Sequence, residues 1–337
     1  IVPGNVSGNV SDWEIIAMPA ALRDVARHAG VSVTTAHRGI NGKDELGEAA
    51  RQRILDAARE LGYVPNQTAR SLVSGRSYTI GMVVTDNASP VYAGVVRGVE
   101  SVLKAAGYGL LLCNSADDAS GSLACLELLR SKQVDGVLIT PVQSDHAEID
   151  YLRDAQIPYV LLLRMFEDQA DDVVITNNRA GGRDATALLI ELGHTRIGHI
   201  AGPAQVSSAQ GRLAGYRHAL DDGRLPFDPS LIEHAPFTTE GGYVAATALL
   251  TRAERPTAIF AANDMQAVGV MKAARELGIR IPEELALVGG DDIELAEFLA
   301  VPLTTFHQPA FEIGSLGAEL LLVRLDGDSE EPHQIVM

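Results

Sequence analysis

The sequence predicts an α/β protein in which a small all-helical segment precedes two doubly wound parallel-sheet units. Three observations carry this prediction. Two short helical patterns broken by a glycine turn lie near the start of the chain. From residue 78 onward, apolar runs of strand length alternate with helical patterns, and the alternation restarts after residue 177. With 337 residues the chain is long enough for two or three domains.

The first two helices are predicted on either side of Gly30. Apolar residues recur at helical spacing before this turn and continue to Ile40 after it, and Ser32 stands where the second helix needs an N-cap. Two helices joined by a tight glycine turn can place the second one in a DNA major groove, although an ordinary helical hairpin is the alternative for this segment alone. The outward residues of the second helix would be Val33, Thr34, His37 and Arg38.

Two more helices are predicted before the sheet units. One spans about 48–61, with Gly47 at its N-cap and Gly62 as its C-terminal stop. A short helix at about 67–73 follows Pro65. At about two turns it is too short to be stable alone in water, so we expect it to order only against a partner.

The alternating region predicts strands that are buried between helices. The expected strands are 79–84, 109–113, 136–139, 158–163, 197–201, 258–261 and 285–288, and the expected helices are 92–106, 122–131, 147–155, 181–192, 208–220, 241–250 and 265–277. Near-continuous apolar strands are typical of parallel sheets with right-handed crossovers. Two such units in series imply a cleft between them, with ligand groups at the carboxyl ends of the strands.

Charge is distributed unevenly along the chain. The net charge is −17, but residues 20–80 hold nine Lys/Arg and six Asp/Glu, so that segment is +3 and the remainder is −20. A basic head on an acidic body suits contact with nucleic-acid phosphates through the head alone, and such binding weakens as salt rises.

Other function classes find little support. No apolar run approaches the ~20 residues of a membrane span, and residues 1–20 lack the basic start of a secretory signal, so we expect a cytoplasmic protein. Cys113 and Cys125 are expected to be buried small hydrophobes, and the histidines show no metal-ligand spacing. No nucleophile elbow, phosphate loop or zinc motif is present. Asp291 and Asp292, adjacent on an irregular loop, would point apart, so we expect no catalytic residue, metal or cofactor.

Short strings throughout the chain match a known family. They are Asp24-Val-Ala-Arg-His-Ala-Gly-Val-Ser32, Leu61-Gly-Tyr-Val-Pro-Asn66, Ala69-Arg-Ser-Leu72, Glu191-Leu-Gly-His-Thr-Arg-Ile197, Ala201-Gly-Pro203, Arg212-Leu-Ala-Gly-Tyr216, Ala258-Ile-Phe-Ala-Ala-Asn-Asp264, Asp291-Asp292 and Pro302-Leu-Thr-Thr305. From about Leu22 to Met337 the chain resembles the lactose-repressor/galactose-repressor (LacI/GalR) family of bacterial transcription regulators. The resemblance implies a helix-turn-helix head, a hinge helix and two subdomains of the periplasmic-binding-protein-like type I fold.

The resemblance also implies the domain boundaries. They are an extension at 1–19, a DNA-binding head at 20–64, a hinge helix and linker at 65–77, and an effector-binding and dimerisation core at 78–337, with an N-subdomain of about 78–176 plus 307–337 and a C-subdomain of about 177–306. We expect residues 1–17 to be a disordered extension or an upstream translated stretch, with Met18 as a natural start. We also expect the chain to stop short of a last strand segment found in relatives.

The implied function is that of a ligand-responsive repressor, acting as a homodimer on a pseudo-palindromic site in double-stranded operator DNA. The resemblance implies phosphate contacts for Ser32, Thr35 and Asn41, and base contacts for Val33, Thr34 and Arg38. The planar fork of Arg38 fits the O6/N7 edge of guanine. His37, where the family usually has Ser, could donate to a phosphate.

In the implied hinge helix, Leu72 would wedge into the minor groove and kink the DNA, while Ala69 would pack against its twin. Asn66 and Arg70 complete the DNA-binding set. One departure lies in the recognition helix: Gly39 stands where relatives have Val or Ala, which is expected to cost about 0.5–1 kcal/mol and to remove a core contact.

The effector cleft follows from the same resemblance. An Arg with carboxylate or amide partners suits a hydroxyl-rich ligand, because each sugar hydroxyl both donates and accepts. Leu163 stands where many sugar-responsive relatives have Asp, and Gly290 replaces a usual aromatic residue, so the cleft differs from that for a simple hexose. A transport-type sugar-binding protein without DNA function is the alternative. The expected effector-binding residues are Thr85, Tyr92, Arg164, Ser208, Arg212, Asn263 and Asp291.

Overall fold

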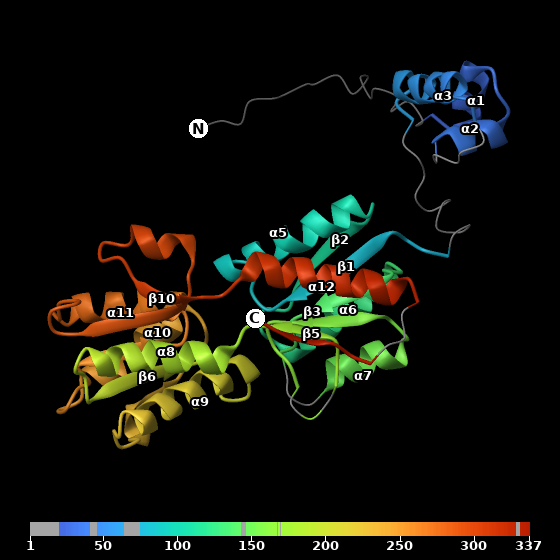
Figure 1. Ribbon diagram of the computed structural model, residues 1–337. Coiled ribbons are helices and arrows are strands. Elements are labelled where there is room, and N and C mark those ends of the chain that lie inside the picture. Colours follow the sequence, from blue (N-terminus) through green and yellow to red (C-terminus); the bar gives the residue numbers. More distant parts are fainter. Residues whose placement is uncertain are drawn as a thin grey trace, which may run out of the picture. The chain divides into compact units, whose positions relative to one another are not determined.

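The structure is a computed structural model that describes residues 20–40, 46–63, 75–142, 146–166, 168, 170–327 and 331–337. The expected extension at 1–17, Asn41 and the expected hinge helix at 67–73 lie outside the described residues. The chain divides into two compact units, Ile1–Gly75 and Arg76–Met337, and each is described by itself (Figure 1).

The first unit contains the three predicted helices of the head. They are α1 (Leu22–Ala29), α2 (Val33–Ile40) and α3 (Glu48–Glu60). Gly30, at φ 67°, ends α1, and the backbone N–H of Thr35 donates to Ser32 Oγ at 3.1 Å, which caps α2 as predicted. The helices pack around the fully buried side chains of Val25, Ala36 and Ile54.

Gly39 corrects one detail of the sequence prediction. The position does not lack a core contact, because Ile54 of α3 fills the space beside it. A Cβ built on Gly39 would lie 2.6 Å from Ile54 Cδ1. The glycine therefore lets α2 and α3 approach closely, and its helix-propensity cost is offset by this packing.

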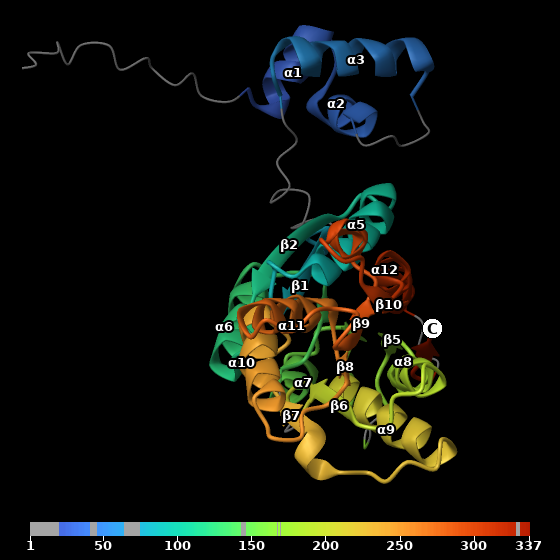
Figure 2. The ribbon, with the colours of Figure 1, turned by 90° about the vertical axis from the view of Figure 1, so that its left-hand side faces the viewer.

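The second unit begins with a six-stranded parallel sheet, which we call the first lobe together with its helices. The sheet order is β11-β5-β4-β3-β1-β2. Helices α5 and α12 pack on one face, and α6 and α7 cover the other (Figures 1 and 2). The elements are β1 (Thr79–Val84), α5 (Pro90–Ala105), β2 (Gly109–Asn114), α6 (Ala119–Ser131), β3 (Gly136–Ile139), α7 (Ala147–Asp154), β4 (Tyr159–Leu162), β5 (Val173–Ile175), α12 (Ala310–Leu325) and β11 (Gln334–Val336).

The second lobe is a five-stranded parallel sheet of order β10-β9-β8-β6-β7. Helices α8 and α9 pack against each other, as do α10 and α11. The elements are α8 (Asn178–Glu191), β6 (Ile197–Ala201), α9 (Ser207–Asp222), η1 (Pro229–Leu231), β7 (Ile232–His234), α10 (Thr239–Leu250), β8 (Ala258–Ala261), α11 (Asp264–Glu276), β9 (Ala286–Asp291), η2 (Glu294–Phe298) and β10 (Thr304–His307). The chain enters this lobe after β5 and returns to the first lobe between β10 and α12.

Several predicted boundaries shift because capping residues start the helices early. Asn177 accepts a hydrogen bond from the backbone of Ala180, so α8 begins at Asn178, and Asp118 does the same for Gly121 at the start of α6. The predicted strands 79–84, 136–139, 197–201 and 258–261 are confirmed. The short strands β5, β7, β10 and β11 were not predicted, since none of them contains an apolar run of four residues.

Two further expectations were wrong. Cys113 and Cys125 are partly exposed rather than buried, because Cys113 lies on β2 at the edge of its sheet and packs beside Cys125 of α6. Asp291 is the last residue of β9 rather than part of an irregular loop. Its carboxylate pairs with Arg212, while that of Asp292 pairs with His307, so the two side chains serve different partners.

Candidate functional site

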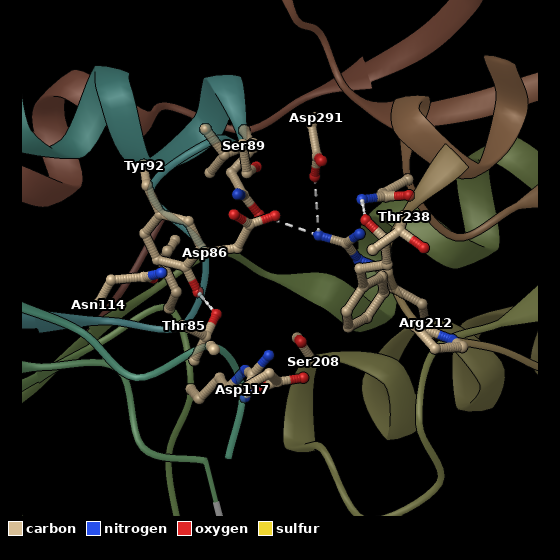
Figure 3. Close-up of a pocket in the computed structure, with 18 residues that line it drawn as sticks. Thr85, Asp86, Ser89, Tyr92, Asn114, Asp117, Ser208, Arg212, Thr238 and Asp291 are labelled. Atoms are coloured by element: carbon tan, nitrogen blue, oxygen red, sulfur yellow. Dashed lines mark hydrogen bonds and ion pairs between the residues drawn. The ribbon is translucent and has the colours of Figure 1, made fainter. Parts of the chain in front are cut away.

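A cavity of about 550 Å³ lies between the two lobes, at the carboxyl ends of their strands (Figure 3). This is where the sequence predicted ligand groups to meet. The structure brings all the expected effector-binding residues to its lining: Thr85, Tyr92, Arg164, Ser208, Arg212, Asn263 and Asp291.

The first-lobe wall is built on the loops after β1 and β4. Thr85 follows β1, and its Oγ1 lies 2.7 Å from the hydroxyl of Tyr92 in the first turn of α5. Arg164 follows β4 and donates from Nη1 to Asp117 Oδ1 at 2.9 Å and to the carbonyl of Pro141 at 3.1 Å. Its Nε and Nη2 have no hydrogen-bond partner among the residues that the structure describes. Arg164 lines the cavity, so these donors are available to a ligand.

Arg212 organises the second-lobe wall from α9. Its Nε donates to Asn178 Oδ1 at 2.9 Å and Nη1 donates to the carbonyl of Ala262, while Nη2 reaches Asp291 Oδ1 at 3.2 Å and Gln308 Oε1 at 3.0 Å. The guanidinium carbon also lies within 5.8 Å of the Phe237 ring centroid and 5.1 Å of the Phe306 centroid. Protein groups thus occupy most of its donors, and its first effect is to fix Asp291 and Gln308 in position.

Asp291 is the buried acid of the cavity. Its backbone φ is 114°, a region that residues with a Cβ seldom adopt. Burial raises the pKa of Asp291 to about 7, and the nearby Asp264 carboxylate adds to this rise while Arg212 opposes it. The second carboxylate oxygen of Asp291 is thus a hydrogen-bond acceptor or, when protonated, a donor near neutral pH.

Asn263 has a structural use that sequence reasoning did not anticipate. It is the N-cap of α11, where its Oδ1 accepts from the backbone of Gln266 at 2.9 Å and its Nδ2 donates to the carbonyl of Phe237 at 3.2 Å. One N–H of the amide remains for a ligand.

Sequence reasoning missed part of the lining. Asn114 is the last residue of β2 and Asp117 follows it, and Phe237 and Thr238 precede α10. All stand at the carboxyl end of a strand, which is the signal that could have found them. Gln308 follows β10, a strand that was itself not predicted.

The head carries the predicted DNA-facing residues on one surface of α2. Val33, Thr34, His37 and Arg38 are exposed, as predicted from helical periodicity. Thr35 is half-buried, and its hydroxyl lies 2.7 Å from Ser32 Oγ, so these two hydroxyls are engaged at the start of α2. Asn41, Asn66, Ala69, Arg70 and Leu72 lie outside the described residues.

The described part of the chain has neither a cluster of metal-ligand side chains nor a helix suited to a membrane. Within it, no three His, Cys, Asp or Glu side chains are grouped to hold an ion. No helix there has both the length and the apolarity to cross a bilayer.

A helix-turn-helix head on a two-lobed core with a cavity between the lobes defines a class: the ligand-responsive, DNA-binding transcription regulators. Comparison with known proteins agrees. Residues 21–66 match the family model described as bacterial regulatory proteins of the lacI family, and residues 186–337 match the periplasmic binding protein-like domain.

Relatives cover nearly the whole chain. The ribose operon repressor of Haemophilus influenzae is 37% identical over 94% of this chain and 96% of its own length. The solved structure of the transcriptional regulator CelR in complex with cellobiose is 36% identical, with a TM-score of 0.73 over 94% of this chain and 97% of that one. The lac repressor dimer bound to operator and the anti-inducer ONPF is 27% identical, with a TM-score of 0.83 over 94% and 96% of the two chains. The chain belongs to the lacI family of bacterial regulatory proteins.

Proposed function

We propose that this protein is a homodimeric repressor whose affinity for a pseudo-palindromic operator is controlled by an uncharged, hydroxyl-rich ligand of the sugar class in the interlobe cavity. The observation that carries the proposal is the balance of charged and hydrogen-bonding groups lining that cavity.

Charge favours a neutral ligand. The cavity is lined by three acidic side chains, Asp86, Asp117 and Asp291, and by two basic ones, Arg164 and Arg212. A phosphorylated or carboxylated ligand would enter a site without excess positive charge, which is unfavourable. Hydrogen bonding favours hydroxyl groups. Arg164, whose Nε and Nη2 have no partner among the described residues, lines a cavity that is also lined by the carboxylates of Asp291 and Asp117. Each sugar hydroxyl can satisfy one donor and one acceptor.

DNA recognition is assigned to the exposed surface of α2. Arg38 and His37 supply cationic or donor groups there, and Val33, which is 49% exposed, supplies an apolar contact suited to a thymine methyl group. We assign Ser32, Thr35, Asn41, Asn66 and Arg70 to phosphate and backbone contacts, and Leu72 with Ala69 to the minor groove.

The dimer is proposed to form at the β2 edge of the first-lobe sheet, which no other described strand pairs with. β2 ends the strand order, and its Leu111 and Leu112 are 38% and 44% exposed. An uncovered apolar edge strand invites pairing with another chain, and a second copy would cover it. Leu112→Lys is expected to shift the protein to monomer in sedimentation analysis. Leu128→Lys, at a leucine of α6 that is 49% exposed, is the matched control and is expected to leave the dimer intact.

The ligand assignment is tested by titration calorimetry of the full chain with D-ribose, cellobiose and D-ribose 5-phosphate. We expect a neutral sugar to bind at least about tenfold more tightly than the phosphate ester, and Arg164→Gln to weaken that binding by about tenfold or more. Arg183→Gln, which removes an exposed arginine paired with Asp222 on the surface of the second lobe, is the control. Preference for the phosphate ester, or binding of neither sugar, would contradict the assignment.

Operator recognition is tested by selection from random duplex DNA with the full chain. A two-fold symmetric site is expected, and the bound sugar is expected to change its Kd. Enrichment of a single, asymmetric site would contradict the proposal that a homodimer binds the operator.

A further inference from the structure

The core begins at Arg76, and the C-terminal end of α12 holds this residue. Arg76 Nη2 donates to the backbone carbonyl of Leu325, and Nη1 lies 3.2 Å from Asp326 Oδ1. The last carbonyls of a helix have no partner within the helix, so a guanidinium is well suited to cap them and to complement the helix dipole. Arg76 therefore ties the start of the core to α12.

Asp135, which directly precedes β3, holds the next two residues from a different element. Its Oδ1 accepts from the backbone N–H and the hydroxyl of Ser77 at 2.7 and 3.0 Å, and its Oδ2 accepts from the backbone N–H of Tyr78 at 2.8 Å. All three are charge-assisted hydrogen bonds. Tyr78 has a φ of 54°, in the left-handed region that side chains with a Cβ disfavour. The carboxylate thus holds the backbone in a conformation that it would not otherwise prefer.

The helix that holds Arg76 starts beside the ligand cavity. Gln308, which accepts from Arg212 in the cavity, lies two residues before Ala310, the first residue of α12. α12 has 16 residues, so it spans about 24 Å from the cavity to Leu325. One rigid element thus connects the cavity with the point where the chain enters the core.

α12 is further stiffened by backbone contact with α5, which lies alongside it (Figure 1). A Cβ on Gly98 of α5 would lie 2.0 Å from the carbonyl oxygen of Phe311, and a Cβ on Gly314 of α12 would lie 2.0 Å from that of Val95. Because the two backbones touch at these glycines, the helices are expected to move as one body.

We propose that Asp135 is a positioning residue for the ligand response, and that α12 carries a rearrangement at Gln308 to residues 76–78. Residues 76–78 are bound by two different elements, through Arg76 to the Leu325 carbonyl and through Ser77 and Tyr78 to Asp135. A shift of α12 against β3 must therefore change one of these two contacts. In the sequence this segment follows the expected hinge helix, so either change is expected to alter how the head is tethered. The inference rests on the proposed function and names the regulation of that same site.

The first test needs neither ligand nor operator. Hydrogen exchange of the full chain is compared with that of Gln308→Ala. We expect the backbone amides of Ser77 and Tyr78 to exchange about threefold faster or more. Gln308→Glu, which keeps an acceptor for Arg212, is expected to restore the parental rate, and Gln210→Ala, at an exposed glutamine of α9, is the matched control. A change confined to the cavity, with these two amides unaltered, would overturn the inference.

The second test measures coupling. Operator Kd is determined with and without the sugar for the full chain, for Asp135→Asn, and for Asp228→Asn, which removes a similar carboxylate that caps η1 in the second lobe. Asp135→Asn is expected to reduce the ratio of the two operator Kd values by about fivefold or more, with sugar affinity unchanged. An unchanged ratio would overturn the inference. If the sugar does not change the operator Kd of the parent protein, the proposed function fails. The exchange experiment alone then tests whether α12 transmits a change at Gln308 to residues 76–78.

Discussion

Replacement of Arg212 by Met is expected to destabilise the core in a pH-dependent way. The substitution keeps much of the side-chain volume but removes every donor that reaches Asn178, Ala262, Asp291 and Gln308. The pair with Asp291 is almost completely buried, since the two side chains are 4% and 5% exposed. Removal of one partner of a buried ion pair costs about 3–5 kcal/mol, because the other partner remains desolvated.

The pH dependence follows from the raised pKa of Asp291, about 7 in the folded protein against an ordinary 3.8. The contribution of the Asp291 carboxyl to folding stability is fully present below its ordinary pKa, and it is lost as the pH rises through the folded-state pKa. Arg212 lowers the pKa of Asp291, so its removal raises that pKa further. Below pH 7 both the parent protein and the variant carry a protonated Asp291 when folded. Its charge therefore adds nothing to the difference in unfolding free energy between them. Above pH 7 the difference grows by up to about 1.4 kcal/mol per pH unit.

The assay is urea denaturation followed by circular dichroism at pH 6 and pH 8.5. We expect the variant to lose about 3–5 kcal/mol of unfolding free energy at pH 8.5 and at least about 1 kcal/mol less than that at pH 6. Arg183→Met, which breaks a half-exposed ion pair with Asp222, is the control and is expected to cost no more than about 1 kcal/mol at either pH. An equal loss at both pH values, or a loss near that of the control, would refute the reasoning.

Three further outcomes are expected in the head and hinge. Gly39→Ala adds a methyl group 2.6 Å from Ile54 Cδ1, so overpacking of about 1–3 kcal/mol outweighs a helix-propensity gain of about 1 kcal/mol; hydrogen exchange in α2 and α3 is expected to accelerate, and slower exchange would contradict this. Arg38→Ala is expected to cost about 1–3 kcal/mol of operator binding and to relax preference at one base pair, measured by gel shift on single-substituted sites. Leu72→Ala is expected to remove most specific operator affinity while sugar binding measured by calorimetry is retained; equal loss of both would disprove a hinge role.

The fold could be predicted well where the local pattern is strong. The strand Thr79–Val84 is a near-continuous apolar segment of six residues, and its bounds were predicted as observed. β5 and β7 have three residues each and were missed, because pairing with neighbouring strands rather than local sequence makes them strands.

The cavity could be predicted only in part. Its position followed from strand topology, and its first set of residues from family resemblance. Gln308 escaped both, because its place depends on the crossing from β10 to α12. The dual use of Asn263, as a cap and as a cavity residue, is visible only once Phe237 and Gln266 are placed in space. Burial of Cys113 was predicted wrongly because an apolar run does not reveal that its strand lies at a sheet edge.

The backbone conformation of Asp291 has a consequence for substitutions at this position. At φ 114° a glycine would be relaxed where aspartate is strained, so Asp291→Gly would relieve the backbone and also remove a buried acid. Loss of the carboxylate would also leave the buried guanidinium of Arg212 without its charged partner, and this cost opposes the relief of the backbone. The ion pair with Arg212 thus retains a strained backbone at Asp291, and a glycine here is expected to remove the response to ligand together with the cavity's buried acid.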